Sequence, residues 1–388
     1  MKKTPPRIDT RVVHAGDPEP RVDGTVSLPI FQTAMFLHAG EADYHDLRYI
    51  RLNNTPNQVA AARKLASLEN AEAALVAGSG MAAITTTLLS LLGSGDHLLV
   101  QNTLYGGTHD FLAQDLGGFG VAHDFIDTDD PASWKERLRP TTKAIYVESM
   151  SNPLLQVGDL EAVAAFAREH GLFSVIDNTF PSPINFRPLD HGFDLSLHSC
   201  TKYLNGHSDI VAGAVIGRGE LVERVRRKLN HLGGTLDPHA CFLLSRGMKT
   251  LALRVHRQND SALRLAGMLE QQDRVQRVNY PGLPAHPRHE RARALFDGFG
   301  GMMSFELEGG LDTARRFMQA LRIPLIAPSL GGVESLVTLP ATTSHLGMPP
   351  EERRRRGITD GLIRVSVGIE ACEDLLEDFD QALRRATS

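Results

Sequence analysis

The chain has 388 residues, 42% of them hydrophobic and 22% charged, a balance typical of a soluble globular protein with two domains. Its 41 basic and 46 acidic side chains give a formal net charge of −5, which provides no electrostatic support for binding nucleic acid. The three widely spaced cysteines argue against a disulfide framework and a metal site. Since no secretion signal or membrane-spanning run is evident, we expect a cytoplasmic protein.

The first 48 residues contain prolines and glycines but little hydrophobic periodicity. Such a segment is typical of an arm that lies across a neighbouring subunit, and we assign residues 1–48 this role. An amphipathic helix is expected next, over 57–73, because Val59, Leu65 and Leu68 recur at helical spacing.

Short apolar runs then alternate with helical patterns through the first two thirds of the chain. Helices are expected at 81–92 and 161–170, between strands. The expected strands are 74–77, 97–101, 143–148, 173–177, 194–198 and 210–216. This order predicts an α/β fold with a mostly parallel sheet covered on both faces, in a large domain over 49–245.

The pattern changes after a long helix predicted from 245 to 269. Strands are expected at 302–307, 336–339 and 363–367, and helices at 312–321 and 373–385. We therefore predict a smaller α+β domain over 246–388, joined to the large domain through the long helix.

Candidate binding and catalytic residues lie at the ends of five successive strands of the large domain. Ligands of open parallel sheets bind beyond the carboxyl ends of the strands, so these residues are expected to lie close together. They are the helix start 78–81, the segment 105–108, the segment 149–153, Asp177 and Lys202.

Pyridoxal phosphate (PLP) chemistry requires this combination of groups. The cofactor's aldehyde needs a lysine amine, for which we assign Lys202, and its pyridine nitrogen needs a carboxylate that keeps it protonated, for which we assign Asp177. Tyr105 would stack on the ring.

The cofactor's phosphate suits the amino end of a helix, where backbone N–H groups have no partner within the helix. We assign this role to Gly80 and Met81, with the hydroxyl groups of Ser199 and Thr201 alongside.

Taken singly, these residues have ordinary explanations. Lys202 could be a surface lysine, Asp177 a helix cap and Tyr105 a core aromatic. Gly78, Gly80 and Ala83 also match the dinucleotide fingerprint G-x-G-x-x-G/A. That fingerprint requires an acid at the end of the next strand to bind ribose, but this strand ends at Gln101, which disfavours a nicotinamide cofactor.

Motifs distributed over nearly the whole chain resemble the Cys/Met-metabolism family of PLP-dependent enzymes, which includes methionine γ-lyase, cystathionine γ-lyase and cystathionine γ-synthase. They are the segments 13–16, 49–51, 79–81, 105–108, 148–153, 177–180, 199–209, 233–238, 329–336 and 364–368.

The resemblance implies the PLP-dependent transferase fold of type I and a homotetramer built from two active dimers. It implies that Tyr49 and Arg51 reach the cofactor phosphate of the neighbouring subunit, a role suited to the planar guanidinium group. It also implies that Arg364 binds the substrate carboxylate, helped by Asn152 and Ser329.

Three departures from the family pattern bear on the substrate. The segment 52–57 replaces the usual Asn-Pro-Thr, Gly107 stands where methionine γ-lyases carry a cysteine, and Pro328 stands where many cystathionine enzymes carry a glutamate. Loss of that glutamate disfavours a tight grip on the distal ammonium of cystathionine, because a buried ammonium needs a partner.

These observations favour γ-elimination from a methionine-like thioether, which yields 2-oxobutanoate, ammonia and a thiol, with cystathionine as a further substrate. The segment 326–332 resembles the plant-type γ-synthase, so γ-replacement on an O-activated homoserine is the alternative. A PLP-binding regulator without turnover is a third.

Overall fold

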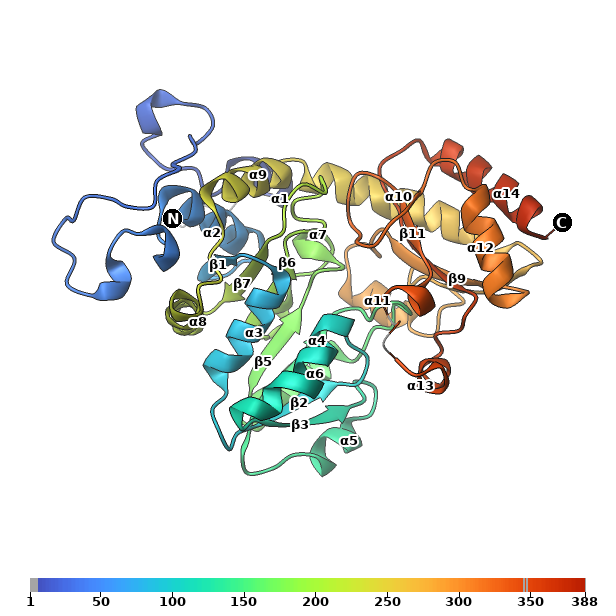
Figure 1. The fold of residues 1–388 in the computed structure, drawn as a ribbon, viewed down its shortest axis with the longest axis horizontal. Helices are drawn as coiled ribbons and strands as arrows, with labels where there is room; N and C mark the ends of the chain where they lie inside the picture. Colours follow the sequence, from blue (N-terminus) through green and yellow to red (C-terminus); the bar gives the residue numbers. More distant parts are fainter. Residues whose placement is uncertain (1–5, 345, 347, 388) are drawn as a thin grey trace. The chain divides into compact units, whose positions relative to one another are not determined.

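The computed structural model describes residues 6–344, 346 and 348–387, which form two compact units (Figure 1). The first comprises residues up to 149 together with 158–252, and the second comprises 150–157 together with the residues from 253 onwards. The chain therefore passes from one unit to the other and back before the final crossing. The domain limits expected at 48 and 245 stay predictions.

The first unit is built on a seven-stranded sheet with the order β1-β7-β6-β5-β4-β2-β3. Six strands run parallel, and β7 runs antiparallel to both of its neighbours. The α/β prediction is confirmed. The strands are β1 Ala73–Ala77, β2 His97–Gln101, β3 Ala122–Ile126, β4 Thr142–Glu148, β5 Phe173–Asp177, β6 Leu195–Ser199 and β7 Gly213–Gly217.

Helices α3 (Gly80–Leu91) and α8 (Gly219–Leu232) pack on one face of this sheet. Their apolar side chains form one core with the buried residues of β5 and β6, including Val175 and Leu197. Because side chains alternate along a strand, His198 points to the opposite face. The remaining helices of this unit are α1 Ile8–His14, α2 Pro56–Leu68, α4 Gly106–Asp110, α5 Pro131–Glu136, α6 Leu160–Glu169, α7 Ser182–Asn185 and α9 Pro238–Met248.

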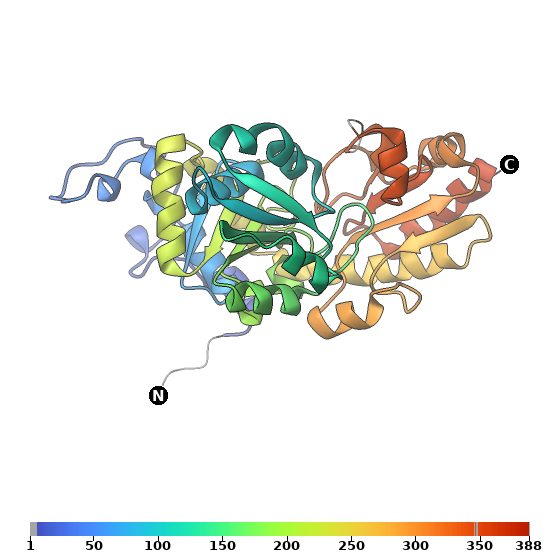
Figure 2. The ribbon, with the colours of Figure 1, turned by 90° about the horizontal axis from the view of Figure 1, so that it is seen from below.

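The residues between α1 and α2 contain three 3₁₀ turns, η1 (Val22–Gly24), η2 (Tyr44–Asp46) and η3 (Ile50–Leu52). They extend away from the sheet as loops in both views (Figures 1 and 2). Met35 and Leu37 are 73% and 96% exposed there. The expected contact of this arm with a neighbouring subunit stays a prediction. Short turns also occur at η4 Phe111–Asp115, η5 Leu116–Phe119 and η6 Pro188–His191.

Two predicted helices differ from the structure. The helix expected over 57–73 ends at Leu68, because Asn70 takes a positive φ of 56° and the chain then enters β1 at Ala73. The long helix expected over 245–269 is two helices, α9 and α10 (Leu251–Glu270). Between them, the N–H groups of Lys249 and Thr250 bond carbonyls three residues back, which tightens the chain into a turn.

The second unit contains a five-stranded mixed sheet with the order β10-β11-β12-β9-β8. Its core includes Phe305, Phe317 and Phe379, which lie in mutual contact. The elements are α10, β8 Val275–Asn279, α11 His289–Leu295, β9 Met302–Leu307, α12 Gly310–Ala320, β10 Leu325–Ile326, β11 Leu336–Thr338, η7 Pro340–Thr342, α13 Pro350–Arg355, β12 Leu362–Ser366 and α14 Cys372–Thr387. Over the described ranges, every helix is too short or too polar to cross a membrane.

Candidate active site

Asp177 and Lys202 lie at the carboxyl ends of adjacent parallel strands, β5 and β6. Three hydrogen bonds connect their segments. The Thr179 N–H donates to Asp177 Oδ1 (2.9 Å), and the Ser199 N–H donates to Thr179 Oγ1 (2.9 Å). The Lys202 N–H then donates to the Ser199 carbonyl (3.1 Å). The predicted lysine and the predicted acid therefore belong to one hydrogen-bonded edge of the sheet.

The amino end of α3 lies directly against Ser199. A Cβ atom on Gly80 would come within 2.9 Å of the Ser199 Cβ atom, so only glycine permits this approach. Ser79 caps the helix by accepting a hydrogen bond from Ala82 N–H (2.9 Å). The N–H groups of Gly80 and Met81, in the first turn, have no acceptor within the helix. Helix start and serine hydroxyl thus form a cradle that suits a phosphate group.

Thr201, predicted to bind the same phosphate, lies beside Ala212 at the start of β7. Its hydroxyl accepts a hydrogen bond from Ala212 N–H (3.0 Å) and donates to the Ala212 carbonyl (3.3 Å). This pair of bonds ties the turn that carries Lys202 to β7, and the role of the Thr201 hydroxyl at the phosphate stays a prediction.

Tyr105 begins α4, and its side chain is accessible, with 46% of the residue exposed. Its ring lies against the backbone of Gly107, because a Cβ atom there would be 2.7 Å from Tyr105 Cε1. The same Cβ atom would be 3.2 Å from Met81 Sδ, so the aromatic ring lies close to the start of α3. This places the predicted stacking residue beside the phosphate cradle.

Glu148 is a buried carboxyl group to which the sequence analysis assigned no role. It ends β4, in register with Asp177 on β5, so both side chains point to the same face of the sheet. Its Oε1 accepts a hydrogen bond from Tyr105 N–H (2.6 Å). The signal available in the sequence was an acidic residue at the end of a buried strand.

Burial determines the electrostatics of these two acids. It raises the pKa of the Asp177 carboxyl, and hydrogen bonds from Thr179 oppose this rise. Burial, followed by repulsion from Asp177, holds the pKa of the Glu148 carboxyl well above its usual range. A cation placed beside Asp177 would stabilise its ionised form, as a protonated pyridine nitrogen does.

The first unit therefore presents the groups that PLP requires: an amine, a buried acid, an aromatic ring and a phosphate cradle. Across the described ranges, the His, Cys, Asp and Glu side chains form no cluster of three or more that could hold a metal ion. The donor set fits PLP.

A second buried polar group lies on the opposite face of the sheet and was also missed by the sequence analysis. Glu69, at the end of α2, accepts hydrogen bonds at Oε1 from Asn178 Nδ2 (3.2 Å), Ser196 Oγ (3.1 Å) and His198 Nε2 (2.5 Å). Asn178 directly follows Asp177, and His198 directly precedes Ser199. The cluster therefore fixes the ends of β5 and β6 from the face of the sheet opposite Asp177.

Tyr49 and Arg51 make contacts at the carboxyl end of α8. The Arg51 guanidinium group donates to the Asn230 carbonyl (2.7 Å) and to the Tyr44 hydroxyl (2.5 Å). It also lies over the Tyr49 ring, 5.6 Å from its centroid. Their predicted action at the cofactor phosphate of a neighbouring subunit stays a prediction.

The three predicted substrate-binding residues come together in the second unit. Arg364, on β12, donates from Nη1 to Asn152 Oδ1 (3.1 Å) and from Nη2 to the Ser329 carbonyl (3.0 Å). Arg364 is 6% exposed. Ser329 has a φ of 91°, a strained conformation for a residue with a Cβ atom, as is often found at functional sites. The two bonds fix the plane of a guanidinium group suited to a carboxylate.

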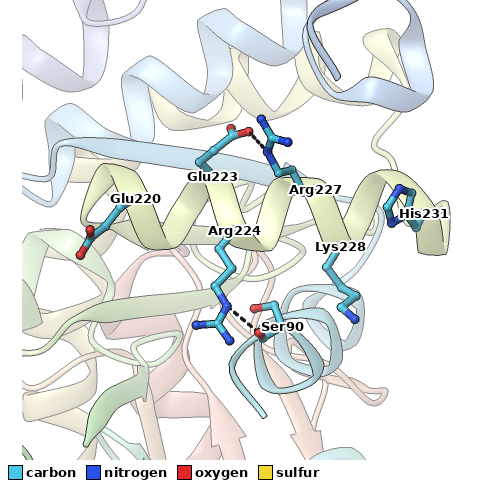
Figure 3. Close-up of a pocket in the computed structure, with 7 residues that line it drawn as sticks. All are labelled: Ser90, Glu220, Glu223, Arg224, Arg227, Lys228 and His231. Atoms are coloured by element: carbon cyan, nitrogen blue, oxygen red, sulfur yellow. Dashed lines mark hydrogen bonds and ion pairs between the residues drawn. The ribbon is translucent and has the colours of Figure 1, made fainter. Parts of the chain in front are cut away.

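A separate surface hollow of about 500 Å³ lies along α8 and contains none of the predicted site residues (Figure 3). Two of its arginines already have partners. Arg224 donates to the Ser90 carbonyl at the end of α3 (2.7 Å), and Arg227 donates to Glu223 (2.9 Å). The Arg224 bond joins α8 to α3, and the Arg227 bond lies within α8. The lining residues are Ser90, Glu220, Glu223, Arg224, Arg227, Lys228 and His231.

Comparisons with known proteins agree with this geometry. Residues 9–384 match the family model described as "Cys/Met metabolism PLP-dependent enzyme". The chain is 44% identical to L-methionine gamma-lyase from Pseudomonas putida over 98% of both chains. It is 42% identical to cystathionine gamma-lyase from Bacillus subtilis (strain 168), over 96% of this chain and 98% of the relative.

Solved structures show the same similarity. Cystathionine gamma synthase from Xanthomonas oryzae pv. oryzae, in complex with aminoacrylate and cysteine, matches with a TM-score of 0.95 and 40% identity over 99% of both chains. Together with the family match, this similarity confirms fold type I and PLP as the cofactor. The chain belongs to the Cys/Met-metabolism family of PLP-dependent enzymes.

Proposed function

We propose that the enzyme catalyses γ-elimination from a methionine-like thioether amino acid, which with one water molecule gives 2-oxobutanoate, ammonia and a thiol. The observation that carries this proposal is the hydrogen-bonded edge that joins Asp177 through Thr179 and Ser199 to Lys202. It supplies a carboxylate and an amine on neighbouring strand ends, as needed at opposite ends of one pyridine ring.

Lys202 and Asp177 perform the central steps. PLP, when bound, supplies the electron sink that stabilises negative charge at the substrate's α-carbon. Asp177 holds the proton on the pyridine nitrogen. Lys202 would hold the cofactor through its amine and, when free, would carry protons between the substrate's α-carbon and β-carbon. Tyr105 stacks on the ring and assists proton transfer to the leaving thiol.

The remaining residues hold the two anionic groups. Gly80, Met81, Ser199 and Thr201 bind the cofactor phosphate, joined by Tyr49 and Arg51 of a second copy in a homotetramer. The substrate carboxylate binds to Arg364, oriented by Asn152 and Ser329, the residues that contact its guanidinium group.

The choice of substrate depends on residues away from the ring. Pro328 provides no charge for the distal ammonium of cystathionine, which favours a methionine-like thioether, and the 44% identity to a methionine γ-lyase is consistent with this preference. The second candidate is γ-replacement by a thiol on an O-activated homoserine. The similarity to a cystathionine γ-synthase and Gly107, in place of the lyase cysteine, favour it.

One assay distinguishes these activities. The purified enzyme is given methionine, cystathionine or an O-activated homoserine, with and without cysteine, and 2-oxobutanoate and new thioether are measured. We expect 2-oxobutanoate from methionine without cysteine, and its loss by roughly 100-fold or more in Lys202→Ala. Thioether formed from activated homoserine and cysteine, with no methionine cleavage, would establish the synthase instead. Bound PLP with no turnover of any substrate would indicate a regulator.

A further inference from the structure

Glu148 occupies a position that the roles above leave unexplained. It is 6% exposed at the end of β4, and its partner in register on β5 is Asp177. Parallel strands place such partners side by side on one face of the sheet. A second carboxyl group is thus buried next to the acid that serves the pyridine nitrogen.

The hydrogen bonds of Glu148 connect it to the loop that carries Tyr105. The Glu148 N–H donates to Gln101 Oε1 (2.9 Å) at the end of β2, and Glu148 Oε1 accepts from the Tyr105 N–H (2.6 Å). Gln101 and Tyr105 stand at the two ends of the loop between β2 and α4. One residue of β4 therefore holds both ends of this loop.

Only one of the two buried acids can ionise at low cost, because like charges in a dry site repel. Asp177 accepts a hydrogen bond from the Thr179 N–H, which stabilises its charge. The pKa of Glu148 lies well above its usual range because of burial and the charge of Asp177. The hydrogen bond from the Tyr105 N–H opposes this rise without cancelling it, so the protonated form of Glu148 is favoured relative to an ordinary glutamate.

We propose that Glu148 is a positioning residue whose carboxyl group holds the Tyr105 peptide and thereby places the Tyr105 ring. The inference rests on the proposed function for the stacking role of Tyr105. A glutamine at this position keeps the shape and the accepting oxygen, whereas an alanine removes the acceptor of the Tyr105 N–H.

The experiment compares Glu148→Ala and Glu148→Gln, each alone and combined with Tyr105→Ala, in the full-length protein. PLP affinity is measured by titration of the cofactor-free protein, and the environment of the bound ring by circular dichroism in its visible absorption band. We expect Glu148→Ala to weaken PLP binding roughly tenfold and to reduce the dichroic band, as follows from the loss of the acceptor that holds the Tyr105 N–H. Glu148→Gln should restore most of both.

The double variants separate positioning from a general structural effect. If Glu148 acts through the Tyr105 ring, Glu148→Ala should change PLP affinity little in the Tyr105→Ala background. In that background the contact between the ring and the cofactor is already absent. An equal loss in both backgrounds, or a Glu148→Gln protein as impaired as Glu148→Ala, would overturn the proposal. Should Glu148→Ala fail to fold, Glu148→Gln is compared with the wild type alone. A marked loss of PLP affinity and of the dichroic band in Glu148→Gln would then overturn the proposal.

Because neither measurement needs a substrate, the outcome is independent of the γ-elimination assay. A protein that binds PLP and shows these effects, but cleaves no thioether, contradicts the proposed reaction and supports the positioning role. If the wild type cleaves methionine, but Glu148→Gln is as impaired in PLP binding as Glu148→Ala, the proposed reaction is supported and the positioning role is contradicted.

Discussion

At the scale of single residues, the site depends on close approaches that only glycine permits. Gly107 is one such position, because a Cβ atom there would stand 2.7 Å from Tyr105 Cε1 and 3.2 Å from Met81 Sδ. The Tyr105 ring would have to move to accept any side chain. The family cysteine expected at this position therefore could not be introduced here without displacing the ring.

We expect Gly107→Ala to lower kcat/KM by roughly tenfold, since displacement of a positioned group raises the barrier by about 1.4 kcal/mol. Steady-state kinetics and the dichroic band of bound PLP would measure the effect. Gly117→Ala is the matched control, because a Cβ atom there would meet nothing within 4 Å. A Gly107→Ala enzyme with unchanged kinetics and dichroism would show that the ring tolerates a neighbour at this position.

Lys202 and Asp177 could be predicted from the sequence because each lies at or just after the end of a strand. Both strands can be recognised from a short run of apolar residues. Their proximity then followed from the parallel sheet, and the structure brings their segments together. The link through Thr179 and the clamp from Glu148 to Tyr105 were not predictable, since each joins residues from different strands through a hydrogen bond that depends on the exact register.

At the scale of helices and strands, the strands with continuous buried apolar runs were predictable, and the more exposed strand β3 was not. The strand 173–177 coincides with β5, whose three middle residues are buried. Strand β3 was missed because it lies at the sheet edge, where only Ile126 of its five residues is buried and no continuous apolar run is required. Residues 150–157 belong to the second unit, although the residues on both sides of them in the sequence belong to the first.

The attachment of α1 to α2 depends on one buried lysine. Lys64 donates from Nζ to the carbonyls of Val12 (2.9 Å) and Val13 (3.2 Å) in the last turn of α1. Burial lowers the pKa of Lys64 from 10.5 to about 8. Between these values the native protein has released a proton that the unfolded chain retains, so the contribution of Lys64 to stability rises as pH increases.

Lys64→Met removes this titration together with the two hydrogen bonds. We expect the free energy of unfolding of the wild type, minus that of Lys64→Met, to rise from pH 7 to pH 10 by at most about 3 kcal/mol. Thermal melts of both proteins at each pH would measure it, and the shared effects of alkaline pH cancel in the difference. A difference that stays constant or shrinks over this range would contradict a buried, titrating Lys64.

At the scale of the whole molecule, Tyr49 and Arg51, in the segment between α1 and α2, allow a test of whether subunits share their active sites. If they do, Tyr49→Ala and Lys202→Ala damage different halves of each site. Mixing the two inactive proteins under subunit exchange should then restore about a quarter of the wild-type activity, because half of the dimers are mixed and each has one intact site.

The control mixes Lys202→Ala with Asp177→Ala. Both residues lie on one edge of the same subunit, so every site in a mixed dimer remains defective and no activity should return. Recovery in this control would contradict the assignment of Lys202 and Asp177 to one subunit's site. No recovery in the first mixture, despite demonstrated exchange, would place Tyr49 and Lys202 in the same subunit's site.

The assignment of residues 150–157 to the second unit has a consequence for chimeras between this enzyme and its relatives. Asn152 bonds Arg364 although more than two hundred positions separate them, and residues 158–252 in between belong to the other unit. A chimera with a single crossover in that interval would take the amide from one parent and the guanidinium from the other. Grafting a foreign carboxy-terminal half therefore requires the eight-residue insert to be transplanted with it.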